Sequence, residues 1–260
     1  MQIIYIRKKS IKKVLGLLGV ILILLLLIWG MQGYWFEDYP TSEQVLSPIY
    51  EVQPGHQQVG LLINVDWGEA VLPDLLKALE QENISATFFI TGRFAEKQEQ
   101  LVQAIAAAGH EIGNHGYSHK HPDQLSLTEN QAEIIKTQAA LQQAGVEPKK
   151  YFAPAYGEKK EQVIRAAEEL GYQVVLWTLD TVDWQDPSVA TIIERIVPKI
   201  KDGALILAHP KQCTLEAIPE LARQIRLAGL EFKTLSQLIK PNPEANAILN
   251  NKTVDNIVLD

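Results

Sequence analysis

The chain has 260 residues, of which 47% are hydrophobic, with 16 glycines, 13 prolines and a single cysteine. This composition excludes an intrinsically disordered chain and a disulfide-stapled scaffold, and the length allows one main domain with a sizeable core. The formal charge is −7 at pH 7; without the five cations of the first thirteen residues, 19 basic and 31 acidic residues leave −12. Such an acidic chain is not expected to bind nucleic acid.

The amino terminus combines a basic segment, residues 1–13, with an uncharged apolar run at 14–31, VLGLLGVILILLLLIWGM. Eighteen residues at about 1.5 Å each give a helix of roughly 27 Å, close to the hydrocarbon thickness of a bilayer. A cleaved signal peptide is the alternative, but the run exceeds a typical h-region and no A-x-A-like site follows it. We predict an uncleaved single-pass anchor in the cell membrane, with residues 1–13 cytoplasmic and the domain extracytoplasmic.

The remaining chain divides into a stalk, a domain and a tail. Residues 32–58 are largely polar and contain three prolines, which is typical of a linker. Over residues 59–240 apolar runs alternate with helix-like segments: VGLLINV with LPDLLKALEQ, ATFFIT with FAEKQEQLVQAIAAAG, HEIGN with LTENQAEIIKTQAALQQAG, KYFAPA with EQVIRAAEELG, QVVLWTL with SVATIIERIVPKI, ALILAHP with LEAIPELARQIRLAG, and EFKTL with SQLI. Seven such units predict an α/β fold whose parallel strands close or nearly close a barrel. Residues 241–260 form a C-terminal tail.

The ends of the predicted strands carry acids and imidazoles. Active sites of such folds lie at the carboxyl ends of the strands. These ends offer Asp66, His115, His119, Tyr156, Asp180, Asp183 and His209. For the stretch INVDWGE alone, a helix cap is the simpler interpretation of Asp66. The gathering of acids and histidines at one rim favours a functional site instead.

The segment GNHGYSHKHP places His115 and His119 four residues apart. Two imidazoles at this spacing can hold one metal ion, usually zinc, with a carboxylate from elsewhere. Histidines exposed in a loop are the alternative, and His121 is interpreted as a bystander. A metal here would polarise a carbonyl and lower the pKa of a bound water, with Asp66 as base and His209 as acid.

Four longer stretches resemble a known family. ATFFITGRFAEK, GHEIGNHGYSH, ELGYQVVLWTLDTVDW and GALILAHP are similar, in this order, to the NodB-type polysaccharide deacetylases of carbohydrate esterase family 4, and the resemblance covers about residues 60–238. It implies a distorted (β/α)7-type barrel and metal-assisted removal of N-acetyl groups from peptidoglycan or chitin-like glycans. The resemblance implies that His115 and His119 hold the metal, that Asp66 is the base and that His209, oriented by Asp183, is the acid. It also implies that the Tyr156 backbone N–H donates to the oxyanion. Trp184 and Leu207 would form walls of the acetyl pocket, and an ordinary core position is the alternative for these two.

Two positions depart from the family's pattern. In its T-F-D-D-G strand end the first aspartate is the base and the second a metal ligand; Asp66 matches the first, and Trp67 replaces the second. In its R-P-P-Y motif the arginine that would hold the base is replaced by Ala153. We expect weakened metal binding, with Asp66 or Glu69 as the remaining candidates for a third ligand. Without the arginine, the pKa of Asp66 is expected to rise in a dry site.

Two functions therefore remain open. The first is a membrane-anchored, extracytoplasmic polysaccharide deacetylase that uses a divalent metal, zinc before others, on an N-acetylated cell-wall or chitin-like glycan. The alternative is a catalytically degenerate glycan-binding or scaffold protein that keeps the barrel and the groove but lacks the metal aspartate.

Overall fold

The computed structural model describes residues 47–53, 55 and 57–239. The predicted anchor at 14–31, the tail at 241–260 and most of the predicted stalk lie outside these residues. None of the helices in the described part combines the length and the apolar character that a membrane span requires.

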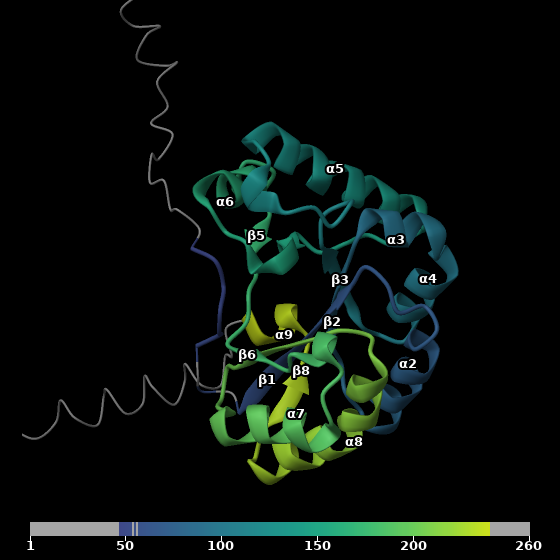
Figure 1. Cartoon of the computed structure of the whole chain (residues 1–260), viewed down its shortest axis with the longest axis vertical. Helices are drawn as coiled ribbons and strands as arrows, with labels where there is room; N and C mark the ends of the chain where they lie inside the picture. Colours follow the sequence, from purple (N-terminus) through teal and green to yellow (C-terminus); the bar gives the residue numbers. More distant parts are fainter. Residues whose placement is uncertain (1–46, 54, 56, 240–260) are drawn as a thin grey trace, which may run out of the picture. The chain divides into compact units, whose positions relative to one another are not determined.

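One curled parallel sheet forms the centre of the described part (Figure 1). Its eight strands are β1 Gln58–Val65, β2 Thr87–Ile90, β3 Glu111–Asn114, β4 Tyr151–Phe152, β5 Gln173–Val174, β6 Leu179–Asp180, β7 Leu205–Ala208 and β8 Glu231–Lys233. The strand order is β5-β4-β3-β2-β1-β7-β6, and β8 pairs with the first residues of β1. Strand pairs of this kind, joined through helices, are the α/β architecture that the alternating sequence predicts.

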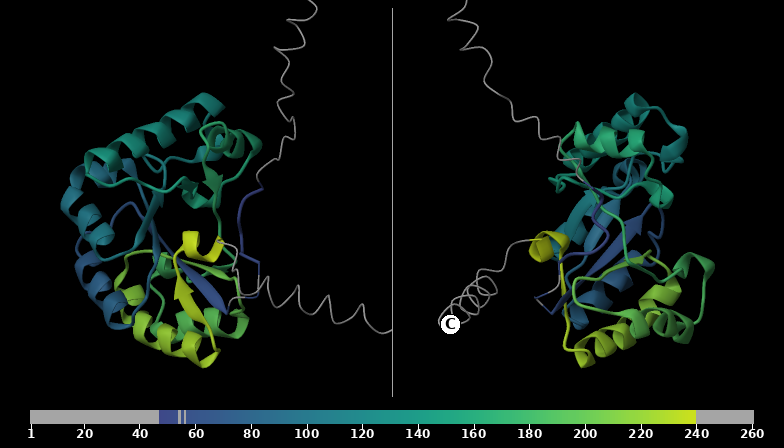
Figure 2. Two further views of the ribbon diagram at one scale, coloured as in Figure 1. Left: turned by 180° about the vertical axis from the view of Figure 1, so that it is seen from behind. Right: turned by 90° about the vertical axis from the view of Figure 1, so that its left-hand side faces the viewer.

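Helices cover the outer side of this sheet, as Figures 1 and 2 show. They are α2 Leu72–Gln81, α3 Gly92–Lys97, α4 Glu99–Ala107, α5 Leu127–Gln143, α6 Glu161–Glu168, α7 Val189–Ile196 and α8 Gln212–Leu227, while the short α9 Leu235–Ile239 follows β8. The longest helix, α5, begins with a reciprocal cap, because Ser126 and Glu129 each accept from the other's backbone N–H.

Two predicted segments are divided in the structure. The helix expected over FAEKQEQLVQAIAAAG is two helices, α3 and α4, separated at Gln98. The single strand expected over QVVLWTL is wrong: its residues form β5 and β6, which lie at opposite ends of the strand order. The chain crosses an open seam between them, so the sheet is curled rather than closed by pairing of β5 with β6.

Residues 47–53, here called the strap, run along this seam. The Ile49 N–H donates to the Val174 carbonyl at 2.9 Å, and the Ile49 carbonyl accepts from the Leu176 N–H at 2.7 Å. Further along, the Val52 N–H donates to the Gly203 carbonyl at 2.9 Å. Gly203 has φ of +81°, and a Cβ there would collide with the Val52 carbonyl oxygen. The last residues of the predicted stalk therefore hydrogen-bond to the domain.

Candidate functional site

Strand alternation directs the site residues inward. On β1, Ile63 and Val65 belong to the core shared with the outer helices, whereas Leu62 packs in a second core inside the curl. Successive side chains of a strand point to opposite faces, so Asn64 and Asp66 follow Leu62 to the inside. On β7 the same rule places Leu207 and His209 in phase with Leu205, which lies in the inner core. These side chains meet at the carboxyl ends of the strands.

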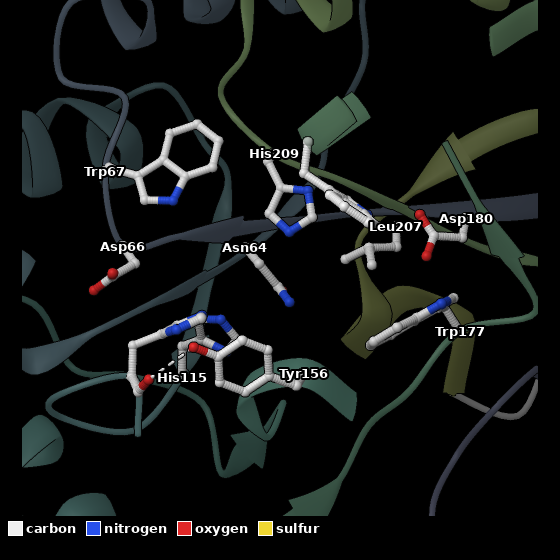
Figure 3. Close-up of a pocket in the computed structure, with 11 residues that line it drawn as sticks. Asn64, Asp66, Trp67, His115, Tyr156, Trp177, Asp180, Leu207 and His209 are labelled. Atoms are coloured by element: carbon white, nitrogen blue, oxygen red, sulfur yellow. Dashed lines mark hydrogen bonds between the residues drawn. The ribbon is translucent and has the colours of Figure 1, made fainter. Parts of the chain in front are cut away.

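A cavity of about 420 Å³ opens there (Figure 3). This volume is within the range of small-molecule and sugar sites. Seven of the eight residues to which the family resemblance assigns roles line it, and so does Asp180. The lining residues are Asn64, Asp66, Trp67, His115, His119, Tyr156, Trp177, Asp180, Trp184, Leu207 and His209. The eighth predicted residue, Asp183, is buried next to His209.

His115 and His119 lie together on one side of the cavity. Their ring centroids are 5.1 Å apart in an edge-on arrangement. His115 Nδ1 lies 2.7 Å from the Ala153 carbonyl oxygen, which can only accept, so Nδ1 carries the proton and Nε2 keeps its lone pair. Burial lowers the pKa of His115 to about 3, and burial also lowers the pKa of His119. Both rings are therefore neutral at pH 7, the form that binds metals. His121 does not line the cavity.

His209 and Asp183 form a tight buried pair on the opposite side. Asp183 Oδ1 lies 2.7 Å from His209 Nδ1, and Oδ2 accepts from the His209 backbone N–H at 2.6 Å. The Thr214 hydroxyl donates to the same carboxylate. Because the carboxylate is held at both oxygens, it fixes the imidazole ring and leaves His209 Nε2 available to the cavity.

Asp66 is held by Arg93, an arginine outside the predicted set of site residues. Arg93 Nε donates to Asp66 Oδ1 at 2.6 Å, a second guanidinium nitrogen pairs with Oδ2, and the Thr91 hydroxyl donates to Oδ1 at 2.9 Å. Burial of Asp66 opposes its ionisation, but the hydrogen bonds from Arg93 and Thr91 outweigh it, so its pKa lies below the ordinary value. The expectation that the substitution at Ala153 leaves Asp66 unheld, with a raised pKa, was wrong.

Trp67 projects into the cavity rim. Its indole stacks on the His209 ring, with centroids 6.0 Å apart and planes at 15°, and Lys211 Nζ lies 5.4 Å from its centroid. The side chain is 38% exposed and borders a second, neighbouring cavity as well. An indole there cannot donate an anionic oxygen to a cation, and it contributes a flat apolar surface instead.

The donors present do not complete a three-ligand metal site. Asp66 is engaged by Arg93, and Glu69 turns back to accept from the Gly68 N–H at 3.1 Å and lines the neighbouring cavity. Across the described residues, no group of three or more His, Cys, Asp or Glu side chains is placed to hold a metal ion. Two imidazoles without a carboxylate fall one ligand short of the usual catalytic zinc set.

Comparisons with known proteins agree with this geometry. Residues 52–175 match the family described as polysaccharide deacetylase. A crystal structure described as BA3943, a CE4 family pseudoenzyme from Bacillus anthracis, superposes with a TM-score of 0.72 at 32% identity, covering 75% of this chain and 69% of that one. The Bc1960 peptidoglycan N-acetylglucosamine deacetylase superposes with the same TM-score and identity, covering 76% of this chain and 94% of that one. The chain belongs to the polysaccharide deacetylase family.

A curated relative adds the sequence-level comparison. A peptidoglycan-N-acetylglucosamine deacetylase of Bacillus cereus is 36% identical over 178 residues, which are 66% of this chain and 64% of that protein. This polysaccharide deacetylase homologue spans less than two thirds of the length of the curated relatives that match it first. A mutant of BA3943 is described as a pseudoenzyme with restored enzymatic activity.

Several site residues were missed by sequence reasoning. Thr91 and Arg93 follow β2, and the rule that sites gather at the carboxyl ends of strands applies to that strand as it does to β1, β3 and β4. Asn64 lies two residues before Asp66, and period-2 alternation alone places both on one face. Trp177 lies in the crossing between β5 and β6, and a sequence read as one continuous strand gave no reason to single it out.

Proposed function

We propose that this protein is a non-hydrolytic member of the polysaccharide deacetylase family that binds N-acetylated glycan, of the peptidoglycan or chitin type, in the 420 Å³ cavity. The observation that carries the proposal is Trp67. An indole stands where the family's pattern has a metal aspartate, and it is stacked on the imidazole expected to act as the acid. The described residues offer no group of three ligands that would replace the missing aspartate.

The cavity keeps the features of a sugar site. Trp67, Tyr156 and Trp184 line it while exposing 38%, 57% and 55% of their surfaces. Large aromatic side chains exposed around a concave site are the groups that bury most area at an interface, and they supply flat faces for the apolar side of a ring. Peptidoglycan is the glycan named for the related deacetylases, and it supplies the substrate class proposed here.

Metal-assisted N-deacetylation is the second candidate, and a specific observation favours it. The Asp183–His209 pair, the held Asp66 and the neutral pair His115 and His119 are all in place around one cavity. If bound, a divalent metal on the two imidazoles would polarise the acetyl carbonyl. Asp66, ionised and restrained by Arg93, would accept a proton from water, and His209 would protonate the leaving amine.

Binding and acetate release, measured on the same sample, separate the two candidates. The full chain in detergent would be titrated calorimetrically with tetra-N-acetyl-chitotetraose, and acetate would be assayed with and without added zinc. We expect binding without acetate release under both conditions. Tyr156→Ala should weaken binding by about tenfold, as expected for a central aromatic contact. Tyr50→Ala, which removes an exposed aromatic of the strap outside the cavity, is the matched control and should bind like the wild type. Zinc-dependent acetate release by the wild type would favour the second candidate.

We also propose that the apolar run at 14–31 anchors the protein in the cell membrane with the domain outside. The support is the charge asymmetry of the sequence, with five cations before the run. Protease added to intact protoplasts should digest the domain. Protection that disappears only after lysis would show the opposite orientation.

A further inference from the structure

Asn64 is a buried amide without a protein partner. Its residue surface is 5% exposed, and its Oδ1 atom has no hydrogen-bond partner. Only one other buried side-chain atom of the described residues shares this property, Glu168 Oε1, and that residue does not line the cavity. Native interiors leave few polar groups unpaired, and a buried unpaired group lowers stability. The position therefore offers an amide oxygen that the folded chain itself does not use.

The amide is aimed at the cavity. Figure 3 shows the Asn64 side chain extending from β1 into the space between His115 and Tyr156 on one side and His209 on the other. Rotation of the terminal amide by a half turn exchanges its oxygen and nitrogen. The group can therefore present a donor or an acceptor to a molecule in the cavity.

Several polar side chains around this space already have protein partners. Asp66 accepts from Arg93, His115 Nδ1 donates to a backbone carbonyl, His209 Nδ1 is paired with Asp183, and Asp180 accepts from the Val182 N–H at 2.7 Å. His115 Nε2 and His209 Nε2 remain available, and Asn64 adds an amide whose oxygen is both buried and without a partner. Leu207, which also lines the cavity, adds an apolar surface there.

We infer that Asn64 is a specificity-determining residue that recognises the acetamido group of the bound glycan. An acetamido group carries one donor, one acceptor and a methyl group. The Asn64 amide complements the polar atoms, and the Leu207 side chain suits the methyl. The inference rests on the proposed function, because it assigns the part of an N-acetylated glycan that the cavity distinguishes. It requires neither a metal ion nor hydrolysis.

The test compares two tetrasaccharides with the same β-1,4-linked backbone. Tetra-N-acetyl-chitotetraose carries acetamido groups, and cellotetraose carries hydroxyls in their place. Calorimetric titration of the full chain in detergent should show that the wild type prefers the acetylated ligand. Asn64→Leu should reduce affinity for that ligand by about tenfold, the loss of about one good hydrogen bond, and leave cellotetraose binding unchanged. Asn64→Asp keeps the size of the side chain but removes the amide donor, and it should also lose much of the preference.

The melting temperature separates a binding role of Asn64 from a structural one, because the two roles predict opposite changes in Asn64→Leu. Because Asn64 Oδ1 bonds to nothing in the fold, Asn64→Leu should melt at or above the wild-type temperature, whereas loss of a structural hydrogen bond would lower it. If the wild type prefers the acetylated ligand and Asn64→Leu keeps the same preference, the role of Asn64 is overturned while the proposed function stands. An equal loss for both ligands does the same, since it reports a damaged cavity. A wild type that binds neither ligand overturns the proposed function together with this inference.

Discussion

Replacing Trp67 by aspartate tests the account of the altered site most directly. The change puts a carboxylate one residue after Asp66, where the family's pattern has its metal ligand, in the cavity that the neutral pair His115 and His119 also lines. Trp67 is 38% exposed, so its removal forfeits a partly buried stack on His209 rather than a core contact. We therefore expect the variant to fold with a stability cost of about 1 kcal/mol.

The gain in metal affinity follows from the number of ligands. Four-ligand structural zinc sites are worth about 10–16 kcal/mol, so one ligand contributes about 3 kcal/mol. Zinc affinity should therefore rise by about a hundredfold in Trp67→Asp. A second change at Ala153 is unnecessary, because Arg93 already holds Asp66. Ala153 is 2% exposed in the inner core, so Ala153→Arg would bury a cation and should destabilise the fold by several kcal/mol.

Calorimetric zinc titration with parallel acetate assays measures both effects. Trp67→Asn is the matched control, because it has the shape of the aspartate without an anionic donor, and it should bind zinc like the wild type. Acetate release is expected from Trp67→Asp alone. Tight binding of one zinc by the wild type, or equal affinities for the aspartate and asparagine variants, would refute the missing-ligand reasoning.

Three further predictions concern stability. Burial holds the pKa of His110 at about 4, against 6.5 in the unfolded chain, so the unfolded state takes up the proton first as pH falls and stability is lost between about pH 6.5 and 4. Urea unfolding at pH 7 and pH 5 measures this loss. The free energy of unfolding should fall between these two pH values by up to about 2 kcal/mol less in His110→Asn than in the wild type. Asp183→Asn turns an amide donor toward the His209 N–H groups and should lower the unfolding free energy by about 2–4 kcal/mol; a change under about 0.5 would contradict the buried network. Gly203→Ala combines about 1–2 kcal/mol of left-handed backbone strain with a collision against the strap, and it should therefore lower the free energy of unfolding more than Gly229→Ala does. Gly229 has φ of +73° and open space around it, so its alanine variant bears the strain alone. Equal losses of unfolding free energy in urea would show that the strap moves aside without cost.

Local patterns were sufficient to predict where the site lies. The alternation of apolar runs and helices predicts parallel strands, and the rule that sites gather at carboxyl ends brings Asp66, His115 and His209 to one cavity. These predictions succeed because both rest on short-range periodicity. The split of QVVLWTL into β5 and β6 could not be predicted in this way, since it depends on the open seam of the sheet and on strap contacts more than a hundred positions away in the chain.

Electrostatic pairing was the harder part to predict. The expectation for Asp66 assumed that its cation had to come from the position of Ala153, because a motif fixes partners by sequence position. In the fold, any residue at the rim can reach the carboxylate, and Arg93 does so from the end of the adjacent strand. A motif therefore identifies a missing side chain, but it does not show that the charge it carried is missing.

The pattern of pairing around the cavity bears on how the altered site is to be understood. A metal site that merely lost its aspartate and its cation would leave the remaining carboxylate uncompensated, and unpaired buried charges are costly. Here Asp66 is compensated by Arg93, Asp183 is fixed by His209 and Thr214, and the indole of Trp67 covers the ring of His209. The Asn64 amide oxygen is the buried side-chain atom of the described cavity that still lacks a partner. A cavity whose charges are balanced by the protein, with one neutral amide left open, is suited to hold a neutral amide-bearing sugar in its ground state.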